Sequence, residues 1–192
     1  MKRITVLLFL VFTFYIDIYS CDCREVQSIE QLRQLSYEYC ELVFIGKLID
    51  YKEADSTYTF QIIELFKGDY KETIIKGKLF DSCSSFPRNK DIWIVYCNFR
   101  ENNYIDINMC TSSRSETEPF CSATEIPAPP RRFMNKKEKE KYKKEELRLF
   151  MKAQQEWKDE IEWLRQLNYL TRAIFELEKC LTTSTRSCSQ AV

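Results

Sequence analysis

Apolar residues alternate with polar ones, or gather in short apolar blocks, in five segments between residues 40 and 110. Segments of this kind, separated by polar turns, are typical of β-strands. The expected strands cover residues 40–51, 58–68, 72–80, 91–99 and 104–110. Bulky residues on one face of each strand favour a small five-stranded barrel, closed or partly open.

The alternation also predicts which side chains face inward. The inward sets are Tyr58, Phe60, Ile62 and Phe66 in the second strand and Ile105, Ile107 and Met109 in the fifth. Asp106 and Asn108 are expected to face outward. Gly46 in the first strand indicates a bulge or a tight bend. The polar turn "RENN" before the fifth strand predicts a hairpin.

Two segments instead have helical spacing. Ser28, followed three residues later by Gln31, forms a capping-box pattern and predicts a short helix over 29–38. Residues 135–181 contain no Gly or Pro and place apolar residues three and four apart, with one slip in register. They predict one long amphipathic helix, or a helix pair broken near Asn168. The later half is apolar enough to need a partner, either the barrel or another copy of itself.

The chain between barrel and helix changes character. Residues 111–133 are rich in Ser, Thr and Pro, and we interpret them as a linker, with 122–134 as its Pro-rich part and Cys121 as a fixed point. The helix begins with interleaved Lys and Glu residues over 136–146, which are more typical of a solvated helix start than of a membrane or nucleic-acid patch. Residues 182–192 form a Ser/Thr-rich C-terminus.

Residues 1–20 resemble a secretory signal peptide, with cleavage expected after Ser20. Lys2 and Arg3 precede an uncharged run over 4–16 that is too short to span a bilayer. A buried N-terminal strand or helix is one alternative. Another is a bacterial lipoprotein signal, "IYSC", in which Cys21 is acylated. The chain is therefore expected to be secreted, or anchored to a membrane through Cys21.

Composition narrows the functional classes. The chain has no histidine, which removes Ser-His-Asp and Cys-His nucleophile systems and His-ligated zinc sites. Lys and Arg number 29, as do Asp and Glu, which argues against bulk nucleic-acid binding. None of the three glycines lies in a phosphate-binding loop. We therefore expect no enzyme, no cofactor and no metal site of the chain's own.

Nine cysteines in a secreted chain predict a disulfide framework. Because nine is odd, at least one cysteine is free, acylated or bonded to another chain. Cys21 and Cys23 point to the same face of an extended chain. A bridge between them would close a small strained ring, so two different partners are expected.

Several motifs resemble the netrin-like module, and most closely the inhibitory domain of the tissue inhibitors of metalloproteinases. They are the Cys-x-Cys start at Cys21 and Cys23, "YCELVFIGKLID", "YTFQIIELFKG" with its Phe-Lys-Gly end, "DSC" at 81–83, "IWIVYC" and "YIDINMC". The resemblance covers residues 21–121. It does not cover the helical tail at 135–181.

The resemblance implies an OB-like five-stranded barrel, followed here by the helical tail, in a protein that is mainly β with α. It also implies three bridges, Cys21 with Cys83, Cys23 with Cys110 and Cys40 with Cys121. Cys180 could then pair with Cys188, leaving Cys97 buried and inert in a strand.

In the inhibitors, the backbone amine and carbonyl of the first Cys chelate the protease zinc, and the next side chain enters the specificity pocket. Carried over, these roles fall to Cys21 and Asp22, with Phe80, Asp81 and Ser82 as the flanking edge tied on through Cys83. One departure is Asp22, which is charged where the inhibitors have a small Ser or Thr. Burying its carboxylate in an apolar pocket would oppose binding. The segment "REVQS" also lacks the family's proline.

Two functional classes follow. The first is an extracellular binding or adaptor module without catalysis, which binds a protein partner or another copy of itself through the helical tail. The second is a metalloproteinase inhibitor that acts on a partner's zinc through Cys21. Neither class involves nucleic acid, and a membrane is involved only if Cys21 is lipidated, because acylation would also block the chelating amine.

Overall fold

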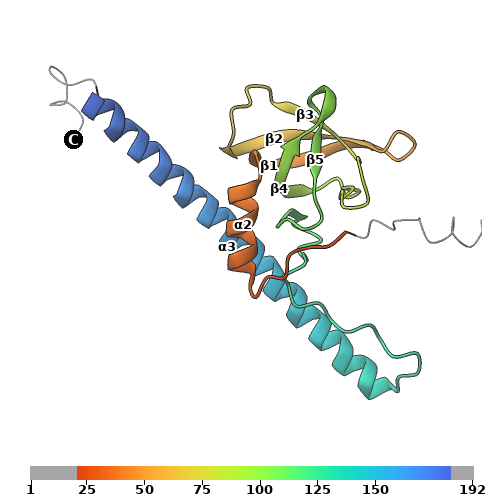
Figure 1. Cartoon of the computed structure of the whole chain (residues 1–192). Coiled ribbons are helices and arrows are strands. Elements are labelled where there is room, and N and C mark those ends of the chain that lie inside the picture. The colour runs from red at the N-terminus through yellow and green to blue at the C-terminus, as the bar shows by residue number, and fades with distance from the viewer. Residues whose placement is uncertain (1–20, 183–192) are drawn as a thin grey trace, which may run out of the picture.

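The computed structural model describes the backbone of residues 21–182 and the side chains of 21–177 and of Lys179. The predicted signal peptide at 1–20, the C-terminus beyond Thr182 and the predicted Cys180–Cys188 bridge lie outside this description. Two parts make up the described chain, a β-barrel and a helix that crosses it and extends past it at both ends (Figure 1).

Five strands close into the expected OB-like barrel. They are β1 (Leu42–Lys52), β2 (Thr57–Lys67), β3 (Ile74–Lys78), β4 (Ile92–Phe99) and β5 (Ile105–Ile107). The order is β1-β2-β3-β5-β4, and β4 pairs again with β1 to close the ring. All pairs are antiparallel except β3–β5, where Gly77 lies opposite Ile105. Gly77 is needed here because a Cβ atom would lie 2.0 Å from the ring of Tyr58.

The expected bulge at Gly46 is present and corrects one predicted face. The β1–β2 register shifts between Ile45 and Gly46, where Ile63 on β2 has no partner. An extra residue turns the following side chains to the other face of the sheet. Tyr58 and Phe60 therefore lie inside the barrel as predicted, whereas Phe66 packs on the outside in a second cluster.

The fifth strand is shorter than expected, and the predicted inward orientation of Met109 is wrong. Ile105 and Ile107 are buried as predicted, but Met109 lies beyond the end of the strand and is half exposed. Asp106 lies on the opposite face from Ile105 and Ile107, as the alternation predicts, but it is buried there, where it accepts a hydrogen bond from Ser84 at 2.6 Å and pairs with Arg100 at 3.3 Å. The "RENN" turn forms the predicted hairpin through the short 3₁₀ helix η1 (Glu101–Asn103).

Helix α2 (Ile29–Tyr39) confirms the predicted first helix and its capping. The Ser28 hydroxyl accepts a hydrogen bond from the Gln31 backbone, and the Gln31 side chain accepts one from the Gln27 backbone. Its inner face, with Ile29, Leu32 and Ser36, is buried.

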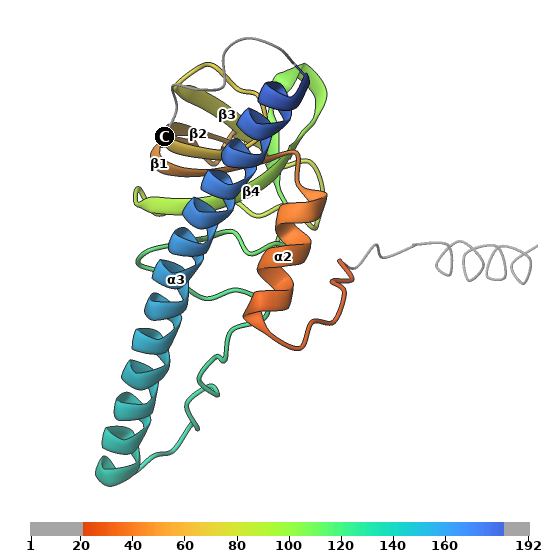
Figure 2. The same cartoon turned by 90° about the vertical axis from the view of Figure 1, so that its left-hand side faces the viewer.

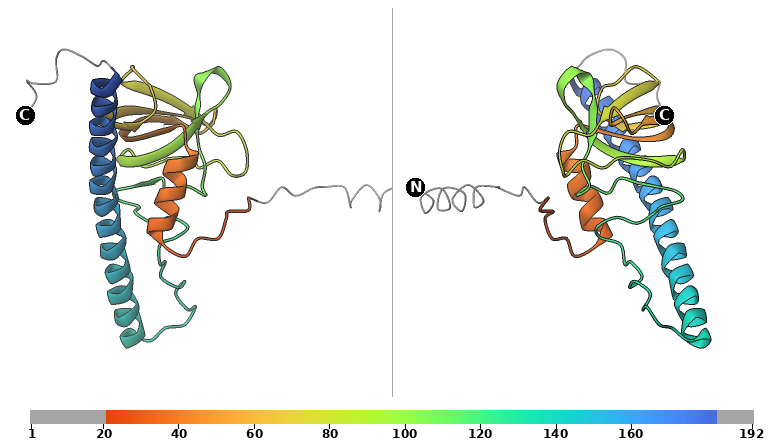
Figure 3. Two further views of the ribbon diagram at one scale, coloured as in Figure 1. Left: turned by 60° about the vertical axis from the view of Figure 1, so that its left-hand side comes forward. Right: turned by 90° about the vertical axis from the view of Figure 1, so that its right-hand side faces the viewer.

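Helix α3 (Lys136–Thr182) is one continuous helix, which settles the choice between a single helix and a pair broken near Asn168. Its middle packs on the outer face of β1 and β4 through Trp157, Ile161 and Leu164. The rings of Trp163 and Tyr37 of α2 pack edge-to-face, with 5.7 Å between their centroids. Figures 2 and 3 show α3 running along one side of the barrel, next to α2.

The predicted linker begins later than its Ser-rich composition indicates. Residues 112–115 are packed into the fold, and Arg114–Ser115 forms strand β6 beside β4. Beyond them the chain runs along the first turns of α3 and turns back into that helix near residue 135 (Figure 1). The part with linker character, 122–134, has no helix or strand.

Candidate functional site

Two disulfides hold the start of the described chain against the barrel. Cys21 is bonded to Cys83 and Cys23 to Cys110, as the resemblance to the netrin-like module implied. Local turns present both barrel cysteines. The Cys83 backbone donates to the Asp81 carboxylate and the Cys110 backbone to the Asn108 side chain, each at 2.8 Å. Such bridges occur in many extracytoplasmic folds and by themselves indicate only an oxidising environment.

The bridges bring the predicted contact residues to one edge. Residues 21–23 lie beside the loop 80–83, and the side chains of Asp22, Phe80, Asp81 and Ser82 are exposed. The loop is well ordered by hydrogen bonds, since the backbones of Phe80 and Asp81 both donate to the Ser84 hydroxyl. A cavity of about 410 Å³ lies next to this edge, between the N-terminal segment and α2, and Asp22, Arg24 and Tyr39 line part of it.

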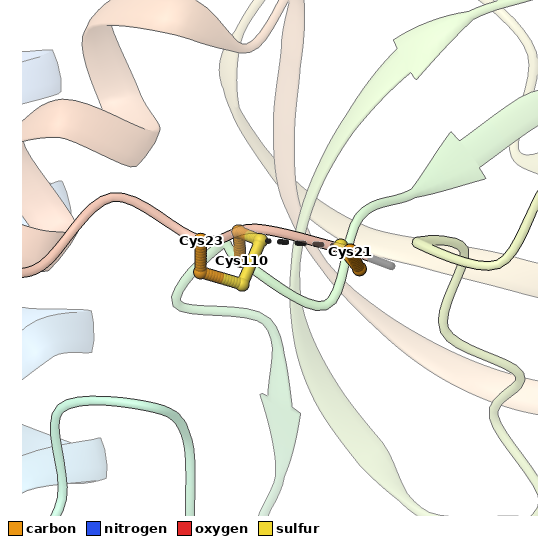
Figure 4. A group of neighbouring side chains, drawn as sticks. All are labelled: Cys21, Cys23 and Cys110. Carbon is orange, nitrogen blue, oxygen red and sulfur yellow. Dashed lines mark hydrogen bonds between the residues drawn. A yellow bond between two sulfur atoms is a disulfide. The ribbon is translucent and has the colours of Figure 1, made fainter. Parts of the chain in front are cut away.

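Three sulfur atoms at this edge lie close enough to share a ligand. The Sγ atoms of Cys21, Cys23 and Cys110 are within 4.8 Å of one another, and Cys21 Sγ lies 3.6 Å from Cys110 Sγ (Figure 4). A metal would need thiolates, however, and all three sulfurs are in disulfides. In this oxidised form the cluster is a covalent clamp.

The implied third bridge, Cys40 with Cys121, is wrong. Both residues are free cysteines. Cys40 follows α2 and packs among the apolar side chains under α3, whereas Cys121 opens a turn closed by the Thr124 hydroxyl. Cys97 is buried in β4, as expected. Burial raises the pKa of all three thiols, that of Cys40 to about 12.

A buried ion pair joins α3 to the barrel, and the sequence reading missed it. Arg114 and Glu160 are both fully enclosed, with 2.8 Å between guanidinium and carboxylate. Glu160 also accepts hydrogen bonds from the Tyr96 hydroxyl at 2.7 Å and from Ser112 at 3.0 Å. Ser112 in turn accepts one from Arg114 at 2.6 Å. One feature of the sequence could have indicated the pair. Glu160 lies three residues after Trp157 and four before Leu164, which places a charged residue on the apolar face of the helix.

The last turns of α3 carry an apolar stripe that the barrel does not cover. Leu170, Ile174 and Leu177 are 56%, 56% and 64% exposed, although the preceding Leu164 is completely buried. The change occurs near Asn168, whose side chain donates to the backbone of Leu65. Beyond that contact the helix extends past the barrel, as the upper part of α3 in Figure 1 shows.

No helix within residues 21–182 combines the length and the apolar character that a membrane span requires. Neither a protein-family model nor a curated protein matches the chain. The resemblance to the netrin-like module therefore rests on the sequence motifs, and the bridges at Cys21 and Cys23 are compatible with it.

Proposed function

We propose that this chain is a secreted, non-catalytic binding module of netrin-like type, which assembles through the C-terminal part of α3. The observation that carries the proposal is the exposed stripe of Leu170, Ile174 and Leu177. Contiguous apolar surface on a projecting helix is typical of interaction sites. The disulfide-clamped barrel would serve as the rigid carrier of that helix.

The partner that fits the stripe is a second copy of the same helix. Positions 170, 174 and 177 are spaced four and three apart, which is the narrow seam of a two-helix coiled coil rather than the broad face of a helix packed on a sheet. Gln166, Thr171 and Ala173 flank the seam and carry no charge, and Glu178 is the one charged residue at a flanking position. In a parallel pair Glu178 of one copy would lie across from the uncharged Ala173 of the other, so two copies can meet there without opposing like charges.

Sedimentation equilibrium of the purified chain tests this proposal. Ile174→Glu places a carboxylate in the seam and should convert a concentration-dependent dimer into a monomer. Arg172→Glu, two residues away on the opposite side of the helix, is the matched control and should leave the dimer intact. A wild-type chain that stays monomeric at concentrations of order 100 μM would overturn self-assembly.

A second candidate function is inhibition of a zinc metalloproteinase, favoured by the clamped edge. Cys21, Asp22 and Cys23 are held in an exposed segment beside Phe80, Asp81 and Ser82. If residues 1–20 are removed, the Cys21 amine and carbonyl become a chelating pair for a partner's zinc. This function requires that Cys21 is not acylated.

Asp22 is the residue that tests the inhibitor function. We expect the wild-type protein to inhibit zinc endopeptidases poorly, because Asp22 would bring a charge into an apolar pocket. Asp22→Thr should improve the inhibition constant by about tenfold or more, since each ~1.4 kcal/mol is a factor of ten. An Ala inserted before Cys21 should abolish the gain by displacing the amine. If Asp22→Thr also fails against a broad panel, the inhibitor function is excluded.

A further inference from the structure

The end of the molecule opposite the apolar stripe is strongly basic. The chain turns back there from the linker into α3 (Figures 1 and 2). Arg131 and Arg132 line a hollow together with residues of the first turns of the helix. Those turns carry six lysines between residues 136 and 144, against only Glu138 and Glu140. We call residues 131–144 the basic tip.

The sequence alone placed these charges on a solvated helix, but the fold gathers some of them around a hollow. A cavity of about 620 Å³ lies between the returning chain and α3. Arg131, Arg132, Lys139 and Lys143 line it, and Glu146 is the one acidic residue among its lining. Phe133 also lines the hollow and is 87% exposed.

Two of the acidic residues near the tip, Glu138 and Glu145, are engaged by other groups. Glu138 caps the helix by accepting a hydrogen bond from the Asn135 backbone at 2.8 Å. The Glu145 carboxylate forms an ion pair with the Arg148 guanidinium at 2.6 Å. Within the described residues, no ion pair involves Arg131, Arg132, Lys139 or Lys143. The positive charge around the hollow is therefore available to an anionic ligand.

We propose that the basic tip binds a sulfated polysaccharide, with sulfate groups in the hollow and a sugar ring against Phe133. Clusters of Lys and Arg of this length are typical of heparin-type patches. Lys136, Lys139 and Lys143 follow one another on one side of the helix at spacings of three and four, over about 10 Å at 1.5 Å per residue. A linear polyanion can follow such a row.

Two other polyanions fit the tip less well. An interfacial membrane helix needs a broad apolar face opposite its charges, whereas the one highly exposed aromatic residue of the basic tip is Phe133, which precedes the helix. Single-stranded nucleic acid is held by several stacking aromatic side chains in a basic groove, and the whole chain carries no net positive charge.

Binding of a size-defined heparin oligosaccharide, measured by calorimetry on the full chain, tests the proposal. Replacing Arg131, Arg132, Lys139 and Lys143 by Gln should weaken binding by about tenfold or more and flatten its dependence on salt. Lys76→Gln with Lys78→Gln, on exposed positions of β3, is the control for charge loss and should change affinity less than twofold. Phe133→Ala should weaken binding while leaving the salt dependence unchanged.

Three further arms decide between ligand classes. Desulfated heparin should not bind, and vesicles with anionic lipids and a single-stranded oligonucleotide should bind more weakly than heparin. The proposal is overturned if wild-type protein does not bind heparin, if the β3 control weakens binding as much as the tip variant, or if vesicles or oligonucleotide bind as tightly. Circular dichroism of each variant confirms that α3 is intact, and Arg131→Gln with Arg132→Gln alone provides a milder variant outside the helix.

Discussion

Arg114 and Glu160 are side chains that water does not reach, so each depends on the other for its charge to be tolerated. Burying an ion pair gives little net stability, but removing one partner strands the other charge in a medium of low polarity. The pair therefore acts mainly as a requirement for correct docking of α3. It aligns one point of the helix with β6, and through Tyr96 with β4.

Arg114→Met should lower the free energy of unfolding by about 3–5 kcal/mol, because it leaves the Glu160 carboxylate buried and unpaired. The double variant Arg114→Met with Glu160→Met should lose much less. Urea denaturation of both measures the difference. Arg148→Met, which removes an exposed pairing with Glu145, is the control and should have little effect. Equal losses in the single and double variants would contradict this account.

Cys40 and Cys97 should be protected from alkylation. Burial raises the pKa of the Cys40 thiol to about 12 and that of Cys97 well above its ordinary value, so almost no thiolate exists at pH 8. Iodoacetamide at pH 8 should label both in guanidinium but neither in the native protein, as read by peptide mass.

Because the folded-state pKa of Cys40 is raised, its contribution to stability is complete below about pH 9 and is lost as the pH rises toward 12. Stability that stays constant over that range would contradict it.

At the scale of elements, alternation predicted every strand of the barrel, and helical spacing together with a capping pattern predicted both helices, because half-buried elements repeat with a fixed period. It failed where that period is broken. The bulge at Ile63 moved Phe66 to the outer face, and the early end of β5 left Met109 exposed. Residues 112–115 were taken as linker because their composition is polar, yet hydrogen bonds to Glu160 and Ser36 bury them.

Leu164 is the element-scale test of how α3 docks. Leu164→Lys puts a charge into the cluster with Trp157 and Ile161, and should lower the free energy of unfolding by several kcal/mol. Leu170→Lys, two turns along on the exposed stripe, should leave it unchanged when measured at concentrations where the chain is monomeric. Thermal and urea unfolding followed by circular dichroism compares them. Equal stability of the two variants would show that the helix is not docked.

At the scale of the whole molecule, α3 has three zones with different surroundings. Its first turns are charged and accompanied by the linker, its middle is buried against the barrel, and its last turns expose an apolar stripe. The sequence predicted the helix but did not predict where its docked part ends and its exposed part begins. The apolar residues before and after Asn168 look alike, and only the size of the barrel decides which of them are covered.

A chain that ends after Asn168 should separate the docked zone from the projecting one. It keeps Trp157, Glu160 and Leu164, so its unfolding midpoint should match that of the full chain under monomeric conditions. It loses Leu170, Ile174 and Leu177, and should therefore sediment as a monomer. A fall in midpoint would mean that the last turns of α3 contribute to the fold.

The docking of α3 also sets an order of events during biosynthesis. The interior cluster of the barrel is complete once Ile107 has been made, but the outer cluster lacks Trp157, Ile161 and Leu164 until some fifty residues later. Domains generally fold from the N-terminal side as the chain emerges. During that interval Val43, Ile94 and Tyr96 are not covered by α3, and the Arg114 guanidinium lacks the Glu160 carboxylate with which it pairs in the finished fold. The nascent barrel therefore exposes the apolar outer surface of β1 and β4, which can aggregate. A chaperone or translocation partner that covers this surface until α3 has been made would raise the yield of folded protein.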